Sequence, residues 1–147
     1  MLDIPVPDPY TPGATPVHFV VRSRQQSLLR DLLSKGADPN ASMGEDITAL
    51  HWASAGGWDD GIEILLEKGA LINARDQYLR ETPLHKAARN TKFGAIELLC
   101  ARGADMKMKN VDGMNYREVL NFAQQNPQDW CIKPERASFC TFYTFTR

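Results

Sequence analysis

The sequence lacks the features that mark membrane-spanning, secreted and nucleic-acid-binding proteins. No run of apolar residues approaches the roughly 20 that span a bilayer, and the first ten residues show neither the basic nor the apolar region of a signal peptide. The 17 basic residues are matched by 18 acidic ones, so there is no basic excess for binding phosphates. We therefore expect no membrane and no nucleic acid among the partners, and a cytoplasmic or nuclear location.

The sequence also has few residues of the kinds that bind metals or catalyse reactions. Its three cysteines, Cys100, Cys131 and Cys140, lack the paired C-x-x-C spacing of zinc and thioredoxin-type sites, which favours reduced thiols. Gly56-Gly57 lacks the spacing and the following Lys-Ser/Thr of a phosphate-binding loop. We therefore predict no cofactor, no metal and no catalytic residue.

What remains has the composition of one ordinary globular domain. The 147 residues match the usual size of a single domain, and 43% of them are hydrophobic and 24% charged. Residues 13–126 carry 14 basic and 14 acidic side chains, so broad electrostatic steering of a partner is not expected.

Two short motifs recur in step along the chain. One is Thr15-Pro16-Val17-His18, which returns as Thr48-Ala49-Leu50-His51 and as Thr82-Pro83-Leu84-His85, at intervals of 33 and 34 residues. The other is Lys35-Gly36-Ala37, which returns at the same intervals as Lys68-Gly69-Ala70 and Arg102-Gly103-Ala104. Two motifs that keep one phase across three copies predict an internal repeat of about 33 residues.

In these motifs the chain resembles the ankyrin-repeat family, over about residues 13–126. The resemblance implies an all-α solenoid of stacked helix-turn-helix units joined by hairpin-like loops. The implied repeats are 13–42, 43–76 and 77–110, with a degenerate fourth at 111–126 in which Tyr116 replaces the usual proline. A proline-rich segment, 1–12, precedes the repeats, and an aromatic segment, 127–147, follows them.

The local chemistry of each copy agrees with this fold. The threonine of the first motif can cap a helix through its hydroxyl, and Pro83 follows Thr82 at a position where a helix needs no N–H. Apolar residues then recur at helical spacing, as in Ile62 and Leu65, and a glycine such as Gly69 follows where a left-handed residue ends a helix. Each repeat is therefore predicted to be a helix pair that is stable only when stacked on its neighbours.

The histidines and two of the tryptophans are interpreted as structural. His18, His51 and His85 are the only histidines, and all three lie at the fourth position of the first motif. Because a catalytic histidine need not recur, this periodicity favours a structural role. The family resemblance implies that each one hydrogen-bonds the neighbouring loop. We expect Trp52 and Trp58 to pack in the core.

The resemblance implies a non-catalytic adaptor that binds a protein partner through its hairpin tips and the concave face of its first helices. The third hairpin is the strongest candidate, because between Asn73 and Thr82 it has one residue more than the 33-residue pattern. Its main contacts are predicted to be Tyr78, Arg80 and Arg89, since Tyr and Arg are enriched among interface hot spots. The remaining predicted contacts are Arg22, Glu45, Ile47, Gln77, Glu81, Lys86, Val111, Asp112 and Met114.

Two interpretations of the third hairpin stay open. If Tyr78 and Arg89 are contacts, exchanging both for Ala weakens partner binding while thermal stability stays nearly unchanged. In the other interpretation, Tyr78 folds over the enlarged hairpin and the arginines only solvate its surface.

The aromatic segment 127–147 leaves further alternatives. It holds more aromatic residues than a flexible tail usually does, among them Trp130, Phe142 and Tyr143. It is interpreted as a cap on the fourth repeat, as a disordered extension or as a motif that docks onto a partner. A second functional hypothesis is small-molecule binding or catalysis in a pocket between the concave face and these aromatics. A third is self-association through this segment.

Overall fold

The computed structural model describes residues 13–126 of the chain. The proline-rich segment 1–12 and the aromatic segment 127–147 lie outside the described residues, and so do Cys131 and Cys140. The hypotheses of a terminal cap, a pocket wall and self-association all concern the second of these segments, so they too lie outside the described residues.

Residues 13–126 form seven α-helices and one pair of very short strands. The helices are α1 (Pro16–Ser23), α2 (Gln26–Ser34), α3 (Ala49–Gly56), α4 (Asp59–Glu67), α5 (Pro83–Arg89), α6 (Phe93–Ala101) and α7 (Tyr116–Gln125). Strands β1 (Ser42–Met43) and β2 (Ile47–Thr48) pair antiparallel across the 3-10 turn η1 (Gly44–Asp46). The predicted all-α class is confirmed.

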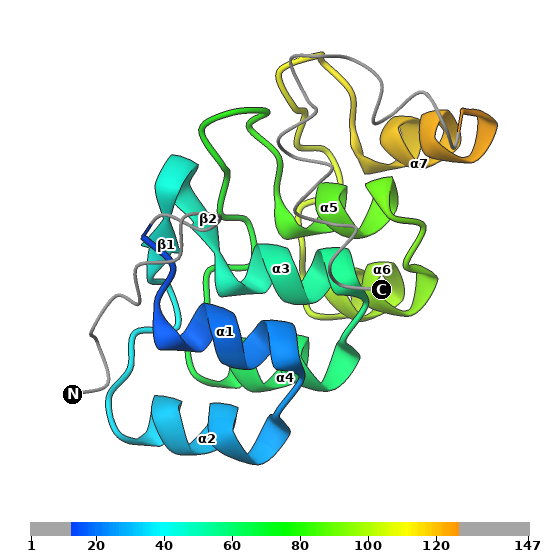
Figure 1. The fold of residues 1–147 in the computed structure, drawn as a ribbon. Helices are drawn as coiled ribbons and strands as arrows, with labels where there is room; N and C mark the ends of the chain where they lie inside the picture. Colours follow the sequence, from blue (N-terminus) through cyan, green and yellow to red (C-terminus); the bar gives the residue numbers. More distant parts are fainter. Residues whose placement is uncertain (1–12, 127–147) are drawn as a thin grey trace.

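The helices are arranged in two layers (Figure 1). Helices α1, α3, α5 and α7 lie side by side in chain order, and each packs on the next. Helices α2, α4 and α6 form the second layer, in which α2 packs on α4 and α4 on α6. Each unit contacts its neighbours in sequence order, which is the stacking that the repeat pattern predicts.

The first-layer helices begin where the repeated threonine predicts. The hydroxyl oxygens of Thr48 and Thr82 accept hydrogen bonds of 3.4 Å from the backbone N–H groups of His51 and His85. In the degenerate fourth copy Asn115 takes this place, and its side-chain oxygen accepts from the N–H of Glu118 at 3.2 Å. All three are helix N-caps of the expected chemistry, and each satisfies an N–H that lies outside the helical ladder.

The second-layer helices end at the repeated glycines. Gly36, Gly69 and Gly103 follow the last helical turns of α2, α4 and α6 with φ of 97°, 94° and 90°. A side chain at such an angle would be strained, whereas glycine adopts it freely. The chain can therefore leave each helix sharply and run out into the next hairpin.

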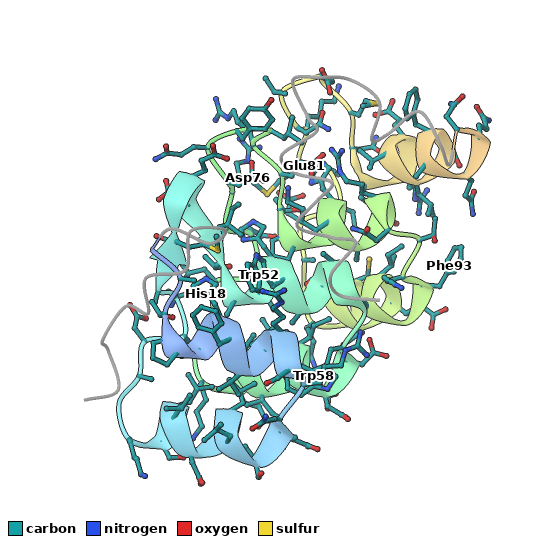
Figure 2. The ribbon with its side chains drawn as sticks, viewed as in Figure 1. His18, Trp52, Trp58, Asp76, Glu81 and Phe93 are labelled. Carbon is teal, nitrogen blue, oxygen red and sulfur yellow. The ribbon has the colours of Figure 1, made fainter. Side chains whose placement is uncertain are left out.

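Both tryptophans named above pack in the core, as predicted. Trp52 on α3 meets the His18 ring edge to face, with ring centroids 5.5 Å apart and an interplanar angle of 81°. Trp58 precedes α4 and lies against Gly61, where a methyl group would be 2.1 Å from its ring. Figure 2 shows Trp52 and Trp58 in the interior of the stack. The Trp52 ring thus fills space between the first and second repeats, and the Trp58 ring packs against the first turn of α4.

No helix within residues 13–126 is both long and apolar enough to cross a membrane.

Candidate functional site

Three hairpins project from the helical stack, ahead of α3, α5 and α7. We name them hairpin 2 (residues 43–47), hairpin 3 (residues 74–81) and hairpin 4 (residues 109–114), and together they form the hairpin row. The backbone N–H of Gln77 donates to the carbonyl of Glu45 at 2.8 Å, and that of Val111 donates to the carbonyl of Leu79 at 2.8 Å. Main-chain hydrogen bonds therefore join each hairpin to the next.

Each of the last two hairpins is closed by one polar side chain. Asp76 Oδ1 accepts from the N–H groups of Leu79 and Glu81 at 2.8 and 3.3 Å. Asn110, which lies 34 residues later, uses its Oδ1 to accept from the N–H groups of Asp112 and Met114 at 3.0 Å each. The loop from Asp76 to Glu81 is one residue longer than that from Asn110 to Met114, so the predicted extra residue lies within it.

Several predicted contact residues lie exposed on the hairpin row. Tyr78 is 37% exposed and Val111 is 56% exposed. The others on the row that are exposed are Glu45, Gln77, Arg80 and Asp112. The Gln77 side chain also donates from Nε2 to Asp46 Oδ2 at 2.7 Å, which links hairpins 2 and 3 a second time. The structure therefore gathers these residues on one continuous surface.

Other predicted contact residues are buried or half-buried. Ile47 is buried in hairpin 2, and Met114 is half-buried at the end of hairpin 4. Arg22 is half-buried in the last turn of α1. Glu81, Lys86 and Arg89 are buried together between hairpin 3 and α5.

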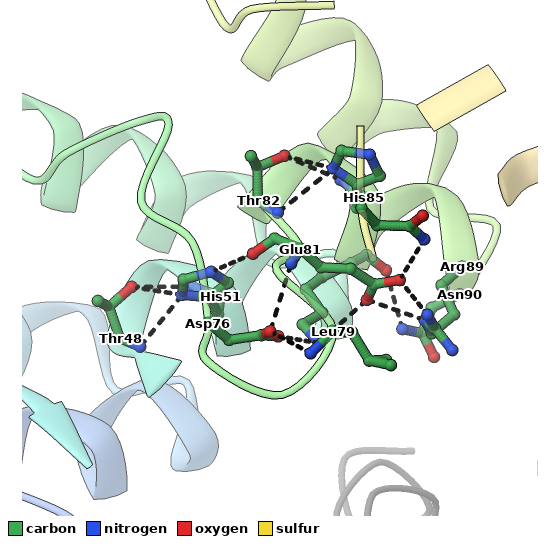
Figure 3. Close-up of polar contacts among 11 residues, drawn as sticks. Thr48, His51, Asp76, Leu79, Glu81, Thr82, His85, Arg89 and Asn90 are labelled. Carbon is green, nitrogen blue, oxygen red and sulfur yellow. Dashed lines mark hydrogen bonds and ion pairs between the residues drawn. The ribbon is translucent and has the colours of Figure 1, made fainter. Parts of the chain in front are cut away.

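Four charged side chains meet in that buried cluster, and Figure 3 labels three of them, Asp76, Glu81 and Arg89. Lys86 on α5 places its Nζ 2.6 Å from Asp76 Oδ2 and 3.1 Å from Glu81 Oε2. Arg89, one turn further along α5, donates from Nε to Glu81 Oε2 at 3.1 Å and from Nη2 to Glu81 Oε1. We name Asp76, Glu81, Lys86 and Arg89 the charged cluster. Its two acids and two bases compensate one another where water is excluded.

The pKa of Glu81 reflects these contacts. Burial alone would raise the pKa of this carboxyl, because it disfavours the charged form. The positive charges of Lys86 and Arg89, with the hydrogen bonds they donate, outweigh that effect and lower the pKa from 4.5 to about 2. The Asn110 side chain adds a donor at 3.3 Å from Glu81 Oε1. The carboxylate is therefore held ionised, and hairpin 3 is held against α5.

The cluster corrects one expectation drawn from the sequence. We expected that exchanging Tyr78 and Arg89 for Ala would leave thermal stability nearly unchanged, but Arg89 is only 8% exposed and is paired with a fully buried Glu81. Removing it would leave part of a buried negative charge uncompensated. The sequence could not reveal this, because the burial depends on hairpin 3 folding back over α5.

The three histidines link successive repeats, as predicted. His18 Nε2 lies 3.0 Å from the carbonyl of Ile47, His51 Nε2 lies 3.0 Å from that of Glu81, and His85 Nε2 lies 3.1 Å from that of Met114. Each Nδ1 accepts from the backbone N–H of the threonine that caps its own helix. A ring that accepts at Nδ1 and donates at Nε2 is neutral.

Burial favours this neutral form. Desolvation lowers the pKa of His18 and of His85, although the carbonyl hydrogen bonds oppose the change. At His51 desolvation is again the larger cause, and the nearby positive charge of Lys86 adds to it, so the pKa falls to about 4. These histidines are therefore neutral at physiological pH, and each one hydrogen-bonds its own repeat to the next.

Asp46 of the hairpin row was not among the predicted contacts, although it links two hairpins. Asp46 is exposed on hairpin 2 and bonds Gln77 of hairpin 3. A signal was present in the sequence, because Asp46 lies two residues before Thr48, and the equivalent residues of the first and fourth repeats are Gly13 and Gly113. A charged residue at a glycine position marks a departure from the repeat.

Within residues 13–126 no group of three or more His, Cys, Asp or Glu side chains could hold a metal ion. The four members of the charged cluster bond one another and the backbone. We therefore assign the charged cluster a structural role and treat the hairpin row as the candidate site.

Comparison with curated proteins finds relatives that share part of this chain. Palmitoyltransferase Hip14 of Drosophila melanogaster is 41% identical over 85 residues, which is 58% of this chain and 13% of that protein. B-cell lymphoma 3 protein homolog of Mus musculus is 30% identical over 105 residues, 69% of this chain and 23% of that protein. Palmitoyltransferase ZDHHC17 of Rattus norvegicus is 31% identical over 84 residues, 57% of this chain and 14% of that protein.

The chain thus spans less than a quarter of the length of each of these relatives. A family model for ankyrin repeats, with three copies, matches residues 17–110. That region covers the helix pairs α1–α2, α3–α4 and α5–α6, except for the first residue of α1, together with hairpins 2 and 3. It also contains two of the histidine links described above, from His18 to Ile47 and from His51 to Glu81. The chain therefore belongs to the ankyrin-repeat family.

Proposed function

We propose that this chain is a protein-binding domain whose contact surface is the hairpin row. Ankyrin repeats are a non-catalytic domain type that generally mediates interactions between proteins. The observation that carries the proposal is the pair of backbone hydrogen bonds joining hairpin 2 to hairpin 3 and hairpin 3 to hairpin 4. They hold exposed side chains from three repeats in one fixed arrangement, which lowers the entropy lost when a partner binds.

The side chains on this surface suit a protein partner. Tyr78 and Val111 offer apolar area on adjacent hairpins, and Glu45, Arg80 and Asp112 add exposed charge on the same three hairpins. Protein interfaces combine exposed apolar residues, aromatic ones above all, with polar residues. We leave Glu81, Lys86 and Arg89 out of the proposed contacts, since their charges are paired in the charged cluster.

The proposal is tested by affinity capture from a cell lysate followed by mass spectrometry. The bait variant carries Tyr78→Ala together with Val111→Ser. The matched control carries Phe93→Ala, which removes an aromatic side chain that is 54% exposed at the start of α6, away from the hairpin row (Figure 2). We expect proteins that are retained by the wild type and by the control to be lost from the double variant.

The opposite pattern would contradict the proposal. If the double variant retains the same proteins as the wild type, the hairpin row is not the contact surface. If Phe93→Ala loses them instead, the surface lies on the side of α6. Thermal unfolding of all three proteins confirms that each bait is folded.

A further inference from the structure

One position of each repeat has a left-handed backbone throughout the chain. It lies two residues before the helix-capping residue, at the end of each hairpin. Its φ is 80° at Gly13, 56° at Asp46, 53° at Arg80 and 76° at Gly113. The first and fourth repeats use glycine, which adopts this conformation freely, and the two central repeats use charged residues.

A side chain at this backbone angle costs conformational energy, because its Cβ approaches the following carbonyl. Asp tolerates the left-handed region better than most residues. Asp46 also contributes to the fold through its hydrogen bond to Gln77. Arg80 is not a residue type that favours the left-handed region. It is exposed, and within residues 13–126 its side chain makes no hydrogen bond or ion pair. Glycine at residue 80 would therefore fit this backbone conformation at least as well, without the loss of a side-chain contact.

The residues on both sides of Arg80 are fixed by contacts with other parts of the fold, whereas the Arg80 side chain is not. The residue before it, Leu79, accepts from the N–H of Val111 at 2.8 Å, and the residue after it, Glu81, belongs to the charged cluster. Arg80 itself is exposed, so its guanidinium is presented to solvent from a fixed backbone.

The exposed charge along the hairpin row changes sign beside Arg80. Hairpin 2 exposes the acids Glu45 and Asp46. Hairpins 3 and 4 expose Arg80 and Lys109 with a single acid, Asp112. An acidic group is therefore repelled at hairpin 2 and attracted at the part of the row formed by hairpins 3 and 4.

We propose that Arg80 is the specificity-determining contact of the hairpin row and that it recognises an acidic segment of a protein partner. An Asp or Glu carboxylate of the partner pairs with the guanidinium, whose planar fork matches a carboxylate with two parallel hydrogen bonds. Tyr78 and Val111 contact the apolar residues next to that acid. This inference rests on the proposed function, because it needs the hairpin row to be the binding surface.

The test uses a random peptide library displayed on phage, selected against the full chain. The variants are Arg80→Gly, Arg80→Glu and, as a matched control, Lys35→Glu, which makes the same charge change at an exposed residue after α2. We expect peptides selected by the wild type and by the control to be enriched in Asp and Glu. Arg80→Glu should select Lys and Arg instead. A peptide selected by the wild type should bind Arg80→Gly roughly 10-fold or more weakly.

The unfolding midpoint of Arg80→Gly separates a binding role from a folding role. We expect it to equal that of the wild type or to exceed it by up to about 4 °C, because glycine relieves the left-handed strain. A clearly lower midpoint would show that Arg80 serves the fold, and it would overturn the proposal.

The remaining outcomes distinguish the two proposals. If the selected peptides have the same acid content for the wild type and Arg80→Glu, but Tyr78→Ala weakens their binding, the inference about Arg80 fails and the hairpin row remains the binding surface. If neither Arg80→Gly nor Tyr78→Ala affects binding of the selected peptides, both proposals fail.

Discussion

Lys86 is a residue whose burial determines its role. Its ammonium group has no exposed surface and lies between the carboxylates of Asp76 and Glu81. In Lys86→Met, Arg89 would be the only base left in the charged cluster to compensate these two acids. Removing one partner of a buried ion pair typically costs about 3–5 kcal/mol. We expect a loss of that size in the free energy of unfolding, measured by urea denaturation.

An exposed lysine provides the control for that measurement. Lys68 follows α4 and is exposed, so Lys68→Met should change the free energy of unfolding by less than about 0.5 kcal/mol. If the two variants unfold at the same urea concentration, the charged cluster does not stabilise the fold.

His51 makes stability depend on pH. In the folded chain its pKa is about 4, whereas the unfolded residue takes up a proton near its ordinary pKa of 6.5. As pH falls through this window only the unfolded state gains the proton, so the free energy of unfolding falls. The loss contributed by His51 should approach about 3 kcal/mol at pH 4. His18 and His85 act in the same direction.

The variant His51→Gln isolates the contribution of His51 to the pH dependence of the free energy of unfolding. Urea denaturation between pH 7 and 5 avoids most carboxylate titration, including that of Glu81, whose pKa is about 2. Over this range we expect the stability of the variant to fall less steeply than that of the wild type. Equal slopes would mean that His51 is protonated in the folded chain at the same pH as in the unfolded one.

Helices α4 and α6 occupy equivalent places in successive repeats, yet one glycine in each should respond oppositely to the same change. Gly61 and Gly94 are 33 residues apart, and Ala normally stabilises a helix relative to Gly by about 0.5–1 kcal/mol. A methyl group at Gly61 would lie 2.1 Å from the Trp58 ring, which is held in the core. Gly61→Ala should therefore destabilise the fold by about 1–3 kcal/mol.

Gly94 provides the matched variant. The three atoms nearest to a methyl group there all belong to Asp59, with Oδ2 at 2.8 Å, and Asp59 is an exposed side chain that can rotate away. Gly94→Ala should therefore raise the unfolding midpoint, while Gly61→Ala lowers it. A lower midpoint for both variants would mean that the Asp59 side chain cannot move, and a higher midpoint for both would mean that the Trp58 ring can.

The helix boundaries were predictable from sequence because they are set by local chemistry. Thr82 caps α5 through an N–H three residues away, and Gly69 lies two residues beyond the end of α4. The histidine links could also be anticipated, because His51 recurs with the repeat. The burial of Lys86 could not be predicted, because its partner Asp76 is ten residues away and depends on how hairpin 3 folds. Predictions therefore succeeded where local chemistry or the repeat period determines a contact, and they failed where the contact depends on how a hairpin folds.

The same distinction holds for the candidate site. Tyr78, Arg80 and Val111 were predicted as contacts from residue type and position in the repeat, and the structure places them exposed on adjacent hairpins. The backbone hydrogen bonds that align these hairpins join residues 32 or more positions apart, such as Gln77 with Glu45. No local sequence pattern specifies those bonds. The alignment of the hairpins into one surface could therefore be seen only in the structure.

At the scale of the whole molecule, each repeat is stabilised mainly by its immediate neighbours. Helix α3 packs between α1 and α5, and α5 packs between α3 and α7. Among the described residues, α1 and α2 pack on each other and mainly against the second repeat, and α7 packs mainly on α5. In a one-dimensional stack of this kind, units with two neighbours open less often than units with one.

Hydrogen–deuterium exchange of the full chain tests this arrangement. Amide protons in α3 and α5 should exchange slowest, and those in α1, α2 and α7 should exchange faster, because opening an outer unit breaks one repeat interface instead of two. Gly61→Ala should then speed exchange in α4 and in its neighbours α2 and α6, while Gly94→Ala should not. Equal exchange rates across all seven helices would instead show that residues 13–126 open as a single cooperative unit.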